Sequence, residues 1–308
     1  MEAWALLVAA TLNAGTVLAL AALGLHINEK AGVVNLGAEG MMLCAALAGY
    51  AAVVHTGSGW AGFAAGMAAG ALLAAMFGVL VIWLDTNPYA TGLALSLLGA
   101  GLSAFAGAGY AQAALPARAG FALPWLADLP FIGPAFFRQH PLVYGAALLA
   151  LGLTWFFRRT RAGLVLRAVG EAPAAAHALG WPVRRIRLAA VVCGGALCGL
   201  AGAYLSIVYT PLWVDGMVAG RGWIALALTA FASWRPARVL VGAYLFGGVT
   251  LGQLYLQGQG VQMPSQFLTM LPYLAVIAAL ALWSRNHVWI QANMPASLGK
   301  PLTALLLK

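Results

Sequence analysis

The chain has 308 residues, of which 63% are hydrophobic and only 7% are charged, whereas about 25% of the residues of an average soluble domain are charged. This composition excludes an ordinary soluble enzyme and indicates a protein whose solvent is the lipid bilayer. The net charge of +9 comes without the clustered basic and aromatic face that nucleic-acid binding requires, so no nucleic-acid partner is expected. The cysteines and histidines are scattered, and we expect neither a metal site nor a cofactor.

Nine windows of the sequence are long and apolar enough to cross a membrane as helices. They lie at 3–25, 33–54, 60–84, 89–109, 141–157, 188–208, 217–234, 239–256 and 267–283. We therefore expect an all-α, polytopic transmembrane helix bundle of about nine spans (eight to ten), in which residues 1–308 form one domain. The N-terminus lacks the basic region of a cleavable signal peptide, so the first span is expected to be retained.

Polar residues enter the second span between residues 27 and 42. An ionised side chain within the bilayer is costly, so Asn35 and Glu39 are expected to face protein or water rather than lipid. The glycines on either side of Glu39 would permit an unwound or re-entrant stretch that lines a cavity. The alternative is that Glu29 and Lys30 lie at the membrane interface and Glu39 pairs with a structural partner.

Glycines at fourfold spacing predict closely packed helices. Gly62, Gly66 and Gly70 share one face of the third span, and Gly195 with Gly199 repeats the pattern in a later span. Small residues of this kind let helix backbones approach one another in a membrane. We expect packing within one subunit; a seam between subunits is the alternative.

The stretch before the fourth span, residues 85–92, contains several polar groups. Pro88 suits the first turn of a helix, so Asp85 and Asn87 are interpreted as helix caps in preference to substrate ligands. Asn87 is nevertheless kept among the candidate residues of a transport pathway.

A cytoplasmic loop is predicted at 158–187, because it carries seven of the sixteen lysines and arginines. Alternation of the spans then places the tail, 285–308, in the cytoplasm and the N-terminus outside. Within the loop, Pro173 suits a helix start, alanines follow, and Gly180 suits a helix end. This capped surface helix favours a docking site over a simple connector.

A charged residue between glycines recurs at the start of a later span, where Arg221 lies between Gly220 and Gly222. Opposite charges at glycine-flanked entries, one in each half of the chain, fit a transporter with pseudo-symmetric halves. A direct pair between Glu39 and Arg221 is one arrangement that would follow.

Motifs for enzymatic chemistry are not found in the sequence. Lys300 follows a glycine but precedes Pro301, so no phosphate-binding loop is present. No nucleophile–base or paired-carboxylate arrangement is visible, and we expect no catalytic residues. Any ATP hydrolysis must therefore reside in a partner.

Five blocks in this order, at 28–42, 91–95, 167–180, 220–227 and 270–274, resemble permease subunits of bacterial ABC importers. The resemblance covers nearly the whole chain and is to the branched-chain amino acid, ribose and simple-sugar class, most of all to its nucleoside and purine permeases. It implies that residues 170–180 form the coupling helix, which docks on the ATP-binding subunit. The implied docking residues are Gly170, Glu171, Ala175, Leu179 and Gly180.

The resemblance further implies a multi-pass permease of the bacterial inner membrane, one half of a heterodimeric pair. It would pass a nucleoside or related purine that a periplasmic or lipoprotein solute-binding protein delivers. The candidate pathway residues are Asn35, Glu39, Asn87 and Arg221. A simple sugar is the alternative substrate, and riboflavin-like aromatics are a further one. An ion-driven secondary transporter, with Glu39 or Asp85 as the coupling carboxylate, and a membrane scaffold are the alternatives of other classes.

Overall fold

The computed structural model describes residues 2–111, 115–116, 132–259 and 293–302, together with isolated positions between 267 and 281. These residues form helices and no strand, which confirms the all-α prediction. The helices are α1 (Glu2–Lys30), α2 (Ala38–Thr56), α3 (Gly59–Ile82), α4 (Pro88–Gly107), α5 (Pro141–Arg159), α6 (Arg161–Glu171), α7 (Pro173–Ala178), α8 (Val183–Tyr204), α9 (Arg221–Phe231) and α10 (Pro236–Gly258), with short turns of other helix types at Ala108–Tyr110, Gly133–Phe137 and Leu205–Tyr209.

Seven helices in the described part of the chain are long and apolar enough to cross a membrane, and each matches one of the predicted windows. The window at 217–234 differs, because α9 has only 11 residues and is too short to span a bilayer alone. Gly216, Ala219 and Gly220 all have positive φ angles, which a helix does not permit, so α9 begins only at Arg221. The predicted span at 267–283 lies partly outside the described residues, and its described positions are helical.

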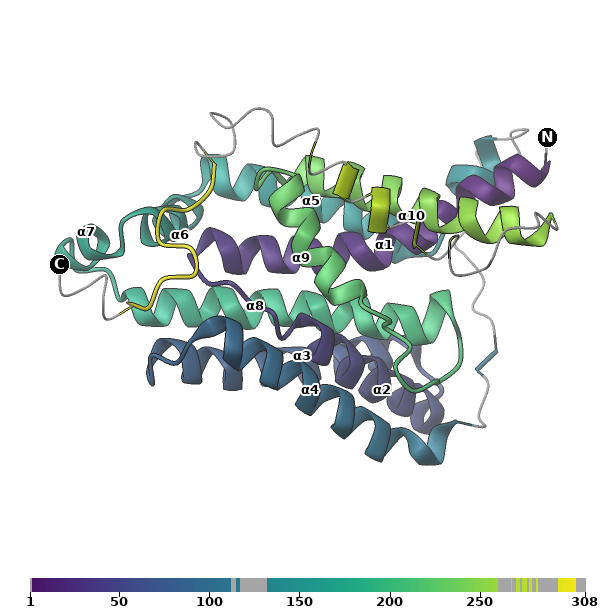
Figure 1. Cartoon of the computed structure of the whole chain (residues 1–308), viewed down its shortest axis with the longest axis horizontal. Coiled ribbons are helices and arrows are strands. Elements are labelled where there is room, and N and C mark those ends of the chain that lie inside the picture. The colour runs from purple at the N-terminus through teal and green to yellow at the C-terminus, as the bar shows by residue number, and fades with distance from the viewer. Residues whose placement is uncertain are drawn as a thin grey trace.

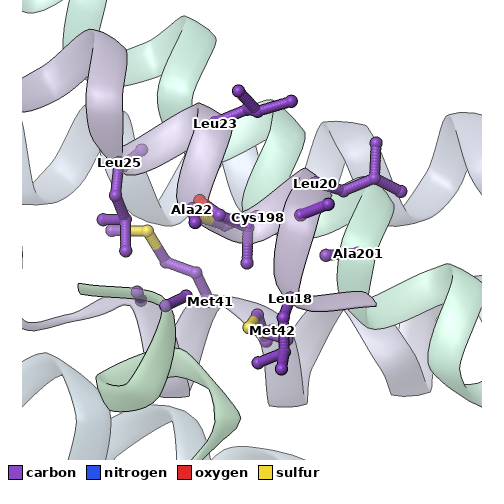
Figure 2. Close-up of a cluster of buried hydrophobic side chains, with 14 of the residues drawn as sticks. Leu18, Leu20, Ala22, Leu23, Leu25, Met41, Met42, Cys198 and Ala201 are labelled. Carbon is purple, nitrogen blue, oxygen red and sulfur yellow. The ribbon is translucent and has the colours of Figure 1, made fainter. Parts of the chain in front are cut away.

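The long helices lie side by side along the long axis of the molecule (Figure 1). Helices α6 and α7 and the last described residues gather at one end, and the N-terminus lies at the other. The core is made mainly by α1, α2 and α8, whose buried Leu20, Met41, Met42 and Ala201 meet in the cluster that Figure 2 shows. Helix α1 therefore lies in the centre of the bundle and is buried over most of its length.

The predicted glycine packing joins α3 to α8 within this one chain. A Cβ atom on Gly70 would lie 2.3 Å from the carbonyl oxygen of Gly195, and one on Gly199 would lie 2.3 Å from that of Gly66. Both distances are far below van der Waals contact, so the two backbones touch where side chains would otherwise stand. Packing within one subunit is confirmed.

Between α1 and α2 the chain is unwound over residues 31–37 and stays buried within the bundle. Gly32 turns the chain with a φ of 86°, and α4 packs so closely alongside that a Cβ on Gly92 would lie 2.9 Å from the backbone nitrogen of Leu36. The unwound stretch predicted beside Glu39 is thus present and ends just before it. The pseudo-symmetry of the two halves of the chain stays a prediction.

Candidate functional site

The carboxylate of Glu39 joins the start of α2 to the start of α9 inside the bundle. Its Oε1 accepts a hydrogen bond of 2.7 Å from the backbone amide of Gly220, and its Oε2 accepts one of 2.8 Å from that of Gly222. The first amides of a helix have no partner within the helix, and an anion at this end is stabilised by the helix dipole. Glu39 therefore caps α9 from a helix more than 180 residues away in sequence.

Arg221, the residue between those two amides, does not pair with Glu39 directly. Its guanidinium donates to the carbonyl oxygens of Met217 and Val218, at 2.9 and 3.0 Å, and lies 6.0 Å from the ring centroid of Tyr209. The arginine thus stabilises the turn that leads into α9. The two charged residues are brought together as predicted, but backbone amides rather than the guanidinium bind the carboxylate.

The two candidate asparagines both stabilise helix starts. The buried Asn35 accepts a hydrogen bond of 3.0 Å from the amide of Gly37 and so holds the turn into α2. Asn87 accepts from the amides of Tyr89 and Ala90, at 2.9 and 3.3 Å, and caps α4 as the sequence indicates. A role of either side chain in a transport pathway stays a prediction.

An apolar cavity of about 500 Å³ lies beside this junction and was not predicted. Its wall includes Gly220, whose amide binds Glu39, and two half-exposed aromatic side chains, Trp223 and Tyr273. Aromatic faces of this kind stack on flat or ring-shaped ligands. The block at 220–227 contains Trp223, but Tyr273 comes from a distant block, and no sequence pattern joins the two.

The predicted docking helix is present as α7, at the end of the bundle where α6 also lies (Figure 1). It begins at Pro173 as predicted and ends at Ala178, and the chain leaves it through Gly180, whose φ is 85°. The helix implied for residues 170–180 is therefore shorter, because Gly170 and Glu171 belong to α6 and the chain breaks at Ala172. The side chain of Leu179 is 79% exposed, although it is large and apolar, and Ala175 and Gly180 are also exposed. A docking role for these exposed residues stays a prediction.

Gly170 and Glu171, the other two predicted docking residues, contact their own chain. A Cβ on the buried Gly170 would lie 2.1 Å from the carbonyl oxygen of Lys30, where α1 ends. The exposed Glu171 accepts a hydrogen bond of 3.2 Å from the amide of Ala296. Helix α6 is thereby attached to the start of the unwound segment that leads to Glu39.

Residues 293–302, which we call the C-terminal strap, fasten this end of the bundle. Ser297 Oγ donates to the carbonyl oxygen of Gly170 and accepts a hydrogen bond of 2.7 Å from the buried guanidinium of Arg187 in α8. The amide of Leu302 donates a hydrogen bond of 3.0 Å to Oδ1 of Asp85, which lies just before α4. Composition and hydropathy carried no signal for these contacts, and the segment was predicted only as a cytoplasmic tail.

Glu29 and Lys30, at the end of α1, are both buried within the protein. Glu29 accepts hydrogen bonds from the hydroxyl of Thr229, at 2.7 Å, and from the indole of Trp234. Lys30 donates to the carbonyl oxygen of Asn293 at 2.7 Å. The end of α1 is therefore fixed to the turn between α9 and α10 and to the C-terminal strap.

Comparison with known proteins agrees with this architecture. The family model described as "Branched-chain amino acid transport system / permease component" matches residues 7–283. The putative glucose ABC transporter permease protein TsgC13 of Haloferax volcanii is 44% identical, over 88% of this chain and 89% of that protein. The nucleoside ABC transporter permease protein NupC of Lactococcus lactis is 32% identical, over 90% of this chain and 92% of that protein.

The guanosine ABC transporter permease protein NupQ of Bacillus subtilis is 31% identical, over 89% of this chain and 91% of that protein. No solved structure matches. A bundle of membrane-long helices, the matched family model and relatives that align over most of their length all agree. The chain belongs to the family of branched-chain amino acid transport system permease components and is a multi-pass permease of the ABC transporter type.

Proposed function

We propose that this permease passes a nucleoside or related purine across the inner (cytoplasmic) membrane, driven by ATP hydrolysis in a partner ATP-binding subunit. The observation that carries the proposal is the Glu39 junction, where one carboxylate binds the first amides of a helix from the other half of the chain. The two helix starts are joined by these hydrogen bonds and by close packing of Gly222 against the backbone of Glu39, and they can separate without breaking either helix. A joint of this kind suits a transporter that alternates between two packed states.

A continuous path of contacts supports coupling of α7 to this junction. Helix α7 follows α6 directly, the last residues of α6 pack against the end of α1, and residues 31–37 run from there to Glu39. A partner that binds α7 differently in its two nucleotide states would bias the position of this segment. ATP binding could thus act on the Glu39 junction without any catalytic residue in the permease.

The proposed orientation has α6, α7 and the C-terminal strap in the cytoplasm and the N-terminus outside. The seven arginines of 158–187 support it, because positively charged loops stay on the cytoplasmic side. A solute-binding protein, periplasmic or lipid-anchored, would dock on the opposite end. We propose a second, different permease subunit as the other half of the pathway.

Leu179→Asp is expected to abolish co-purification of the ATP-binding subunit while the permease still folds in the membrane. The side chain is exposed, so the substitution removes no core contact, but it places a charge in the apolar contact on which docking depends. Pull-down of the ATP-binding subunit from detergent extract measures the effect. Leu212→Asp, which alters an exposed leucine at the opposite end, is the matched control. Undiminished co-purification of Leu179→Asp would contradict the docking role.

A simple sugar is the second candidate substrate, and the 44% identity to a putative glucose permease favours it. The cavity beside Glu39 suits either class, because Trp223 and Tyr273 can stack on a nucleobase or on the apolar face of a sugar ring.

Uptake by proteoliposomes that contain the complete transporter and its binding protein distinguishes the two substrates. Labelled guanosine should accumulate only with ATP inside the vesicles, and excess glucose should not compete. Competition by glucose would assign the sugar instead. ATP-independent uptake by this chain alone under a proton or sodium gradient would contradict both proposals.

A further inference from the structure

A cavity of about 320 Å³, lined in part by charged side chains, lies at the end of the bundle that carries α6. It is enclosed by α1, α5, α6, the start of α10 and the C-terminal strap. Cationic side chains dominate its wall, with Glu171 as the one carboxylate among the described lining residues. The cations are Lys30, Arg158, Arg167, Arg235 and Arg238.

His26 adds an unsatisfied polar group to this wall. Its side chain is 0% exposed, and neither ring nitrogen has a hydrogen-bond partner within the described part of the chain. The ring packs edge-on against Phe157, with 5.4 Å between the centroids. A buried imidazole without a partner is costly, and a small shift of the ring that brings one N–H to an anionic oxygen in the cavity would relieve this cost.

The wall is held in place by contacts that do not involve a ligand. Lys30 is held by its hydrogen bond to the carbonyl oxygen of Asn293. Trp234, which also lines the cavity, donates its indole N–H to Glu29, and this fixes the turn that places Arg235. Lys30 and Arg235 are therefore held at the wall of the cavity, and an anion among the cationic groups that line it would reduce their mutual repulsion.

The neighbouring surface of α5 indicates where such an anion would come from. Leu148, Leu151 and Trp155 are large, apolar and exposed along this helix, as expected of a face that contacts lipid. Arg158 follows Trp155 within one turn, and tryptophan followed by a basic residue is typical of the level of the lipid headgroups. Basic pockets between membrane helices at this level suit anionic headgroups.

We propose that this cavity binds the phosphate group of an anionic phospholipid. Arg158, Arg167 and Arg235 supply positive charge, and His26 donates a hydrogen bond from the closed inner end. The lipid would connect α1, α5, α6 and α10 beside the attachment of α6 to α1. Free phosphate has the same chemistry, and the experiment below includes it as a separate ligand.

The test is thermal unfolding of the purified permease in detergent, titrated with phosphatidylglycerol, with phosphatidylcholine or with inorganic phosphate. Phosphatidylglycerol alone should raise the midpoint. The double variant Arg158→Gln, Arg235→Gln should weaken its apparent affinity about a hundredfold, since each charge-assisted contact is worth about tenfold. Arg159→Gln combined with Arg161→Gln is the matched control, because these arginines are nearby and exposed but do not line the cavity.

His26→Leu separates ligand binding from packing. A leucine fills the same buried site without an unsatisfied polar atom, so the lipid-free midpoint should stay equal or rise. The affinity for phosphatidylglycerol should nevertheless fall about tenfold.

Three results would overturn the proposal. One is an equal response to both lipids, and another is unchanged phosphatidylglycerol affinity in the Arg158, Arg235 double variant. The third is stabilisation by inorganic phosphate without any by phosphatidylglycerol, which would assign a soluble anion in place of the lipid.

Discussion

Glu39→Ala is expected to destabilise the folded permease by about 3 kcal/mol and to abolish uptake, because one buried and one part-buried amide at the start of α9 lose their acceptor. No nearby group replaces the carboxylate, since the guanidinium of Arg221 is itself a donor. The first turn of α9 then unwinds or admits water. Denaturation in detergent and uptake by proteoliposomes measure the two effects.

Glu39→Gln distinguishes this capping role from proton or ion coupling. A carboxamide offers one acceptor oxygen and turns N–H donors toward the second amide, so it should retain about half of the lost stability and part of the uptake. A coupling carboxylate behaves differently, since its replacement by glutamine stops transport and leaves the fold intact. Wild-type stability of Glu39→Gln together with abolished uptake would therefore contradict the cap.

Gly70→Ala is expected to cost about 3 kcal/mol or more, because the new methyl group would stand 2.3 Å from the carbonyl oxygen of Gly195. The obstacle is backbone on a facing helix and cannot rotate away, so α3 and α8 must move apart. Because α8 also packs against α1 in the core, the separation would spread through the bundle. We expect low yield of folded protein and a lowered unfolding midpoint in detergent.

Gly152→Ala is the matched control, since it makes the same change in the interior of another membrane helix. A Cβ on Gly152 of α5 would meet nothing within 4 Å. Alanine has the higher helix propensity by about 1 kcal/mol in water, so this variant should be as stable as the parent protein or slightly more so. Equal destabilisation by Gly70→Ala and Gly152→Ala would show that helix contact at Gly70 is not the cause.

The membrane-long helices and the glycine packing between α3 and α8 could be predicted, because each depends on local sequence. Hydropathy reports burial in lipid or protein, and fourfold spacing of Gly66 and Gly70 places both on one helix face. The short α9 could not be predicted in this way. Its window is apolar apart from Arg221 and a few hydroxyl side chains, and hydropathy is insensitive to the positive φ angles of Ala219 and Gly220 that delay the helix.

The sequence identified the residues of the candidate site better than it identified their contacts. Glycines beside Glu39 and Arg221 correctly indicated two irregular entries that meet, but charge alone suggested an ion pair. The carboxylate instead binds helix amides, which have no other partner, while the guanidinium binds carbonyl oxygens of its own turn. Glu29 likewise resembles a residue at the membrane interface when only the sequence is considered. Its hydrogen-bond partner Thr229 is 200 residues away, so the sequence near Glu29 gives no sign of the contact.

The C-terminal strap leaves the ribosome after every helix that it fastens. A chain whose synthesis stops before residue 293 therefore has α1 to α10 but lacks the serine that joins Gly170 to Arg187. The contacts of the strap with Gly170 and Arg187 can therefore form only after α1 to α10 have been synthesised.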